Sequence, residues 1–123
     1  MVRPDRRTLG ADAENLAFRF LTREGLTPVY RNFRCRCGEI DLIMQDRDCL
    51  VFIEVRYRAS SRFARASLTV DIHKQRKLVR TAALFLSKRA RYAESITRFD
   101  VVAIDGNEIE WIKDAFVSRD ASL

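Results

Sequence analysis

The chain has 123 residues, 47% hydrophobic and 33% charged, a composition typical of a globular protein with one core. A single domain over residues 1–123 is therefore expected, and no apolar run approaches the roughly 20 residues needed to cross a bilayer. The basic start of the chain lacks the apolar segment of a signal peptide, so we expect a cytoplasmic protein with no membrane partner.

The first predicted element is a helix from about Thr8 to Gly25, in which apolar residues recur at helical spacing and the glycine provides a stop. Glu14 lies beside the apolar stripe of this helix, and its position alone favours an ordinary surface acid. A strand is predicted next, over residues 29–33.

Three cysteines follow, an odd number: Cys35, Cys37 and Cys49. Cys35 and Cys37 lie two positions apart in an extended segment, so their thiols are expected on opposite faces and poorly placed for a disulfide. A zinc site with His73 is conceivable, although none of the common ligand spacings is present. Free thiols are the expected state, as is usual in the cytoplasm.

A hairpin is predicted from strands at residues 38–43 and 50–56, joined by a turn at residues 45–48. If the turn is centred between residues 47 and 48, Leu42 faces Ile53 and Asp41 faces Glu54. Alternation then makes one face wholly apolar, with Ile40 beside Leu42, while the other face changes from apolar to charged. The same register places residue 39, a glutamate, opposite Arg56, and it could hold that arginine in place.

The two facing carboxylates are the most informative feature of the hairpin. Opposed Cβ atoms lie roughly 4.5–5.5 Å apart, close enough for two carboxylates to share one cation. Exposed acids on an edge hairpin are the ordinary alternative. Glu54, however, interrupts an apolar run from Leu50 to Val55 that is typical of a buried strand, and a buried carboxylate pair is costly without a cation. The pattern therefore favours a site for a hard divalent ion.

Positive charge is concentrated in residues 56–91, which hold eleven lysines and arginines against the single acid Asp71, although the whole chain carries only +6. A cationic surface beside carboxylates suits a polyanionic substrate. A solvated basic helix without a partner is the alternative. A loop predicted over Ala59–Ser67 contains Phe63, which could stack on a base or simply pin the loop to the core.

The remaining predicted elements are a helix over about Asp71–Arg89, with cations in its first half, and a hairpin of residues 98–104 and 109–112. The order α-β-β-β-α-β-β indicates an α/β fold with a mixed central sheet flanked by helices.

The segments Gly38-Glu39-Ile40-Asp41-Leu42-Ile43 and Phe52-Ile53-Glu54-Val55-Arg56, with Lys74-Gln75 further on, resemble the YraN family of uncharacterised bacterial proteins. That family is similar to the restriction-endonuclease-like, or PD-(D/E)XK, superfamily, and its shape is close to archaeal Holliday junction resolvases and tRNA-endonuclease-like domains. The resemblance covers nearly the whole chain. It implies a restriction-endonuclease-like core and a divalent-metal-dependent endonuclease.

Carried over by position, the resemblance makes Asp41 and Glu54 the ligands of Mg²⁺ or Mn²⁺, and Glu14 a helical acid of the catalytic site. Arg56 stands where the superfamily has lysine; it stays protonated and cannot act as a base, but it can stabilise charge on a phosphate. The residues expected to bind nucleic acid are Arg58, Arg62, Lys74, Gln75 and Arg76. DNA is expected as the nucleic acid in preference to RNA, and the resemblance allows a homodimer.

Two further functions are compatible with this sequence. A catalytically inactive nucleic-acid-binding module on the same fold would account for Arg56 more simply. A structural or interaction protein that keeps only the fold is the third alternative, and it predicts absent or salt-insensitive nucleic-acid binding.

Overall fold

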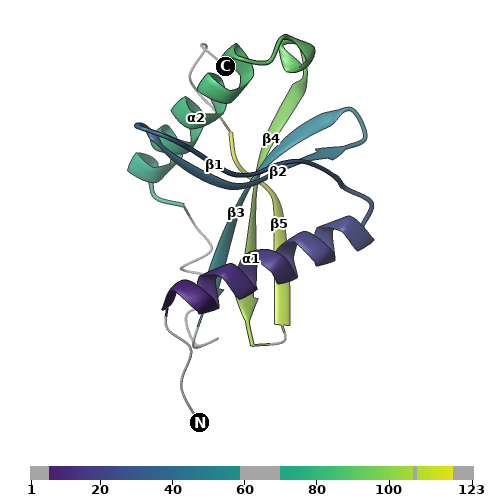
Figure 1. Ribbon diagram of the computed structural model, residues 1–123, viewed down its shortest axis with the longest axis vertical. Helices are drawn as coiled ribbons and strands as arrows, with labels where there is room; N and C mark the ends of the chain where they lie inside the picture. The colour runs from purple at the N-terminus through teal and green to yellow at the C-terminus, as the bar shows by residue number, and fades with distance from the viewer. Residues whose placement is uncertain (1–5, 59–69, 107, 118–123) are drawn as a thin grey trace.

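The computed structural model describes residues 6–58, 70–106 and 108–117, and its elements follow the predicted order α-β-β-β-α-β-β (Figure 1). They are α1 (Arg6–Arg23), β1 (Thr27–Cys35), β2 (Gly38–Asp46), β3 (Cys49–Arg58), α2 (Ile72–Ser87), the short 3₁₀ helix η2 (Ala90–Tyr92), β4 (Ile96–Asp105) and β5 (Glu108–Phe116). The loop predicted at residues 59–67, with Arg62 and Phe63, lies outside the described residues.

The strands form one mixed sheet in the order β1-β2-β3-β4-β5, which confirms the predicted α/β fold. Neighbouring strands are antiparallel except β3 and β4, which pair in parallel over their whole length. Parallel neighbours need a crossover connection, and α2 provides it. Among the residues described, no helix is long and apolar enough to span a membrane.

Two apolar clusters lie against the sheet, each built on one helix. Ala13, Ala17 and Leu21 of α1 pack with Val51 and Ile53 of β3. The second cluster contains Leu78, Val79, Ala82 and Phe85 of α2, together with Leu50 and Phe52 of β3. Because alternate β3 residues enter different clusters, this strand is buried on both faces, which explains its continuous apolar run.

The ends of both helices follow from local chemistry. After α1, Gly25 has a φ of 104°, and the amides of Gly25 and Leu26 donate to the carbonyls of Thr22 and Leu21 at 3.1 and 3.0 Å. This is the Schellman arrangement, which needs a left-handed residue at the glycine position. The predicted helix from Asp71 begins one residue later, because Asp71 is its N-cap and accepts the Lys74 amide at 3.0 Å.

The predicted register of the β2–β3 hairpin is confirmed where the strands pair, since Leu42 pairs with Ile53 and Ile43 pairs with Phe52. The predicted pairs Asp41–Glu54 and Glu39–Arg56 are not among the described strand pairs. The predicted faces were wrong at one residue, Ile40, which packs with Ile43 in the α2 cluster and not with Leu42. The described β2–β3 pairing ends at Leu42, so strict alternation no longer holds for the residues before it.

The prediction of free thiols is confirmed, but the expected orientation of two of them was wrong. Cys35 and Cys37 remain free thiols, but their sulfur atoms are 3.0 Å apart and do not point to opposite faces. Cys35 is the last residue of β1, and Cys37 lies in the tight turn before Gly38. Residues two positions apart in extended backbone share a face, so the expectation of opposite faces misapplied the alternation.

Candidate metal centre

The site lies where β2 and β3 separate. β2 continues as the partner of β1 through the pair Phe33–Ile40, whereas β3 continues as the partner of β4 through Glu54–Val101. At the separation, the Val55 amide donates to Oδ2 of Asp41 at 2.8 Å, so a side chain takes the place of the next strand partner. The backbone of β3 therefore holds the Asp41 side chain at the point where the two strands separate.

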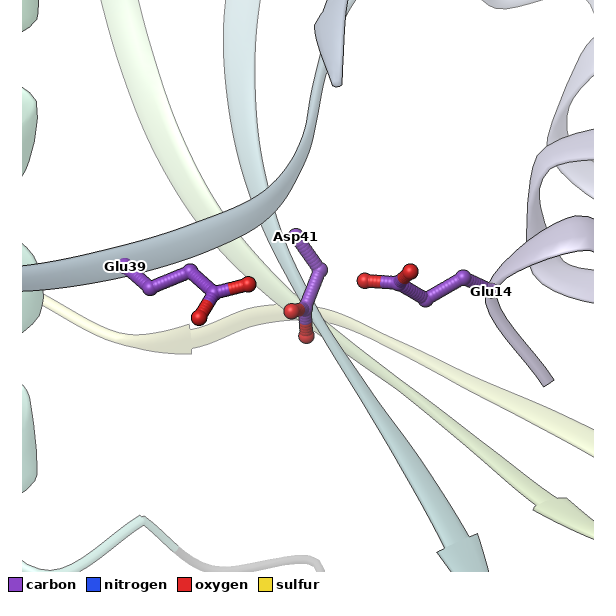
Figure 2. Close-up of side chains that lie close together, drawn as sticks. All are labelled: Glu14, Glu39 and Asp41. Atoms are coloured by element: carbon purple, nitrogen blue, oxygen red, sulfur yellow. The ribbon is translucent and has the colours of Figure 1, made fainter. Parts of the chain in front are cut away.

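Three carboxylates meet at this fork (Figure 2). Glu14 reaches it from α1, while Glu39 and Asp41 come from β2, and one oxygen of each lies within 4.8 Å of the others. In Figure 2, Glu14 and Glu39 approach Asp41 from opposite sides. We name Glu14, Glu39 and Asp41 the acidic cluster. Carboxylate oxygens are the ligands that hard divalent cations such as Mg²⁺ and Mn²⁺ prefer.

The electrostatic surroundings of Asp41 disfavour its charge. Burial is the largest cause, and Glu14 and then Glu54 add to it, so the pKa of Asp41 rises from 3.8 to about 7, although the Val55 amide acts in the opposite direction. A raised pKa means that the negative charge of Asp41 is poorly compensated. A bound cation would compensate that charge in place of the proton.

Glu54 occupies the same site in a different way from the one predicted. It is buried, at 8% exposed, and it forms an ion pair with the Lys74 ammonium and a second one, at 3.4 Å, with Arg56. The nearest charged partners of Glu54 are thus cations. The three carboxylates close enough to share one ion are Glu14, Glu39 and Asp41, without Glu54. Glu54 is still close enough to contribute to the raised pKa of Asp41.

A pocket of about 200 Å³ connects these groups. It is lined by Gly38, Glu39, Asp41, Glu54, Lys74, Lys77 and Leu78. One wall is therefore acidic and the other carries two lysines of α2, an arrangement suited to a ligand that contains both a metal ion and a phosphate.

Gly38 permits this close approach of β2 to α2. A Cβ atom at residue 38 would lie 3.1 Å from Oγ1 of Thr81 and 3.6 Å from Cβ of Lys77. Thr81 is fully buried, and its hydroxyl donates to the Lys77 carbonyl at 2.7 Å, so it has little freedom to move. The glycine of the Gly-Glu-Ile-Asp motif is thus a packing requirement of the pocket.

The other residues expected to bind nucleic acid do not all lie at this pocket. Arg76 is exposed on α2, whereas the side-chain amide of Gln75 donates from Nε2 to the Val70 carbonyl at 2.7 Å, just before the helix. Arg58 is the last residue of β3, and its side chain lies outside the described part, as does the whole of Arg62.

Sequence reasoning missed two residues of the site, Glu39 and Lys77. Glu39 was expected to face Arg56, but it pairs with Arg34 at 3.4 Å and belongs to the acidic cluster. Its spacing of two from Asp41 was the available signal, because residues two apart in a strand share a face. Lys77 lies three positions after Lys74, which places both on one side of α2.

Comparison with known proteins agrees with the resemblance noted in the motifs. Residues 13–104 match a family described as "Uncharacterised protein family UPF0102". A "UPF0102 protein" of Saccharophagus degradans is 50% identical over 107 residues, which cover 87% of this chain and 91% of that protein. Similar proteins occur in Pseudomonas savastanoi pv. phaseolicola, 45% identical with 96% and 100% covered, and in Aliivibrio salmonicida, 48% identical with 94% and 96% covered. The chain therefore belongs to the UPF0102 family.

Proposed function

We propose that this protein is a divalent-metal-dependent nuclease of the restriction-endonuclease-like superfamily that acts on phosphodiester bonds of nucleic acid. The observation that carries the proposal is the acidic cluster, whose central carboxylate Asp41 has a pKa of about 7 and faces the lysines of α2 across one pocket. Grouped hard oxygen ligands and a cationic wall are together what a metal-assisted attack on a phosphate needs.

Mg²⁺ or Mn²⁺ fits this donor set, because all three groups of the acidic cluster offer carboxylate oxygens on converging side chains. Glu14, Glu39 and Asp41 would hold the ion. Glu54, which lines the same pocket, would join them once its ion pair with Lys74 opens. The bound ion would lower the pKa of a water and neutralise phosphate charge.

Lys74 supplies the amine that is missing from position 56. Arg56 presents a planar guanidinium that can stabilise charge, whereas a lysine ammonium is a compact donor with three rotatable N–H groups that can orient a water. Lys74 contacts Glu54 from α2, so its ammonium lies at the pocket although its position in the sequence is far from the β3 motif. Arg56, paired with Glu54, would face the phosphate.

Lys77, Arg76, Arg58 and Arg62 would hold the phosphate backbone without reading bases, since such contacts go to phosphate oxygens. Gln75 is assigned no such contact, because its amide is already hydrogen-bonded to Val70. DNA is the preferred substrate class in this proposal, and a homodimer is compatible with it.

The test is cleavage of labelled single-stranded, duplex and branched DNA and of RNA with Mn²⁺, using wild-type protein, Asp41→Asn and Asp48→Asn. Asp48 is an exposed acid of the β2–β3 turn and serves as the matched control. Asp41→Asn should abolish cleavage while leaving binding intact, and Asp48→Asn should cleave as wild type. Cleavage by Asp41→Asn at the wild-type rate would refute the assignment.

An inactive nucleic-acid-binding module is the second candidate. It is favoured by Glu54, because this carboxylate is already neutralised by Lys74 and Arg56. Salt-dependent binding without turnover on every substrate of the panel would support this function over the first.

A further inference from the structure

A pair of thiols lies beside the pocket and has no role in the proposed reaction. Cys35 and Cys37 flank Arg36 at the turn between β1 and β2, and their sulfur atoms are 3.0 Å apart. Both side chains are half-buried, so they are accessible to small molecules. The third cysteine, Cys49, begins β3, and its Sγ contacts the Leu50 carbonyl at 4.0 Å.

The surroundings of Cys35 favour a reactive thiolate. Burial opposes ionisation, but contacts with the Cys37 sulfur, the Thr81 oxygen and the backbone of Cys37 and Gly38 outweigh it and lower the pKa of Cys35. The Thr81 oxygen lies 3.8 Å from the Cys35 sulfur. A thiol of lowered pKa that is partly exposed is the usual attacking group in thiol chemistry.

We propose that Cys35 and Cys37 are a reversible oxidation site, a dithiol that is converted to an intramolecular disulfide by low-molecular-weight disulfides such as glutathione disulfide. The sulfurs already touch, and closing them to a bond of about 2.05 Å needs a shift of about 1 Å. Arg36, exposed between the two cysteines, would attract the carboxylates of glutathione.

The exchange proceeds in two steps. The Cys35 thiolate attacks one sulfur of glutathione disulfide, the S–S bond breaks, and the departing glutathione takes up the proton that Cys35 had lost. The Cys37 thiol then gives up its proton and attacks the Cys35 sulfur of the mixed disulfide, which expels the second glutathione as a thiol. Two protein thiols are oxidised by two electrons, and one glutathione disulfide is reduced to two thiols.

The position of the pair favours a bond that is easily reduced. A disulfide across one intervening residue closes a very small ring, and departures from relaxed geometry make such a bond more reducible. Gly38 follows Cys37 directly and is already packed against Thr81, which leaves the turn little room to adapt. The site would therefore cycle with the glutathione pool and not remain oxidised.

Tryptic peptides provide the test, because trypsin cuts after Arg34, Arg36 and Arg47. The full-length protein is equilibrated in glutathione redox buffers, alkylated, digested without reductant and analysed by mass spectrometry. We expect peptide 35–36 to remain linked to peptide 37–47 in oxidising buffer and to separate in reducing buffer, with Cys49 alkylated throughout. Separate peptides at every buffer ratio, or glutathione on single cysteines without a link, would overturn the proposal.

Two variants assign the roles. Cys37→Ser removes the resolving thiol, so glutathione should accumulate on Cys35 at a rate at least about tenfold above that on Cys49. Equal rates at Cys35 and Cys49 would refute Cys35 as the attacking group. Cys49→Ser should leave the 35–37 link unchanged, and its loss would show that the linkage depends on exchange through Cys49. Circular dichroism confirms that each variant is folded.

Discussion

The Lys74 ammonium on α2 forms an ion pair with the Glu54 carboxylate on β3, so the cationic helix is attached to the strand that borders the acidic cluster. Glu54 is only 8% exposed, and a buried carboxylate that loses a partner retains its desolvation penalty. The contact therefore has consequences for stability as well as for chemistry.

Lys74→Met keeps most of the side-chain stem and removes the charge. We expect a loss of about 1–2 kcal/mol in the free energy of unfolding, below the value for a fully buried pair because Lys74 is half exposed and Arg56 remains beside Glu54. Urea denaturation measures the loss. Arg80→Met, at an exposed position of the same helix, is the control, and equal losses in both variants would show that the ion pair contributes nothing.

The raised pKa of Asp41 predicts how the free energy of unfolding changes with pH. Its pKa is about 7 in the folded protein and near 3.8 when unfolded, so between these values the folded state holds a proton that the unfolded state has released. Stability should fall by about 2–4 kcal/mol as pH rises from about 4 to 7, and then change little. Asp41→Asn should remove most of this slope in metal-free urea denaturation. An unchanged slope would contradict the raised pKa.

Glu39 is the carboxylate of the acidic cluster that the motif did not reveal, and metal titration tests whether it is a ligand. Glu39→Gln should weaken Mn²⁺ binding at least about tenfold, because one of three carboxylate ligands loses its charge. Isothermal titration calorimetry gives the Kd. Asp12→Asn is the matched control, since Asp12 is an exposed acid on α1 two residues before Glu14. A wild-type Kd for Glu39→Gln would exclude it from the metal site.

Gly38→Ala should destabilise the protein by about 1–3 kcal/mol, because the new Cβ would lie 3.1 Å from Oγ1 of the buried Thr81. Thermal and urea unfolding measure the effect. Gly10→Ala provides the contrast: no atom lies within 4 Å of a Cβ there, so alanine should stabilise α1 by about 0.5–1 kcal/mol. The explanation fails if Thr81→Ala does not recover part of the loss in the double variant.

Arg76 tests the cationic surface apart from the chemistry. Arg76→Ala should weaken DNA binding to a similar extent for all sequences and reduce the slope of log K against log salt by about 1. Fluorescence anisotropy at several salt concentrations measures both quantities. Arg23→Ala, an exposed cation at the end of α1, should leave the slope unchanged. If both variants lower the slope equally, binding is not confined to α2.

The sequence was sufficient for the element order and for the hairpin register, because hydrophobic alternation on two paired strands admits few alignments. It was insufficient where a strand leaves its partner. Ile40 lies just beyond the last β2–β3 pair, where β2 no longer follows β3 and Gly38 packs against α2. Such tertiary contacts leave no periodic signal in the sequence.

Lys74 was quoted in the motif, but its contact with Glu54 could not be derived from spacing. The two residues belong to different elements, and only the crossover between the parallel strands brings α2 against this part of β3. The acidic half of the site is more predictable, since Glu39 and Asp41 are neighbours on one strand.

The parallel pairing of β3 with β4 also sets the order in which the molecule can assemble. The β2–β3 hairpin is local in sequence and can form early, whereas Cys49 of β3 meets Ile96 of β4 only after the intervening chain has been closed into a loop. Closing a long loop slows folding because its entropy is lost before the contacts form. Lys74 and Lys77 lie within that loop, so the β2 carboxylates would be in place before their cationic neighbours. A hairpin that forms first would therefore hold Glu54 beside Arg56 but without the second cation, Lys74, that α2 contributes.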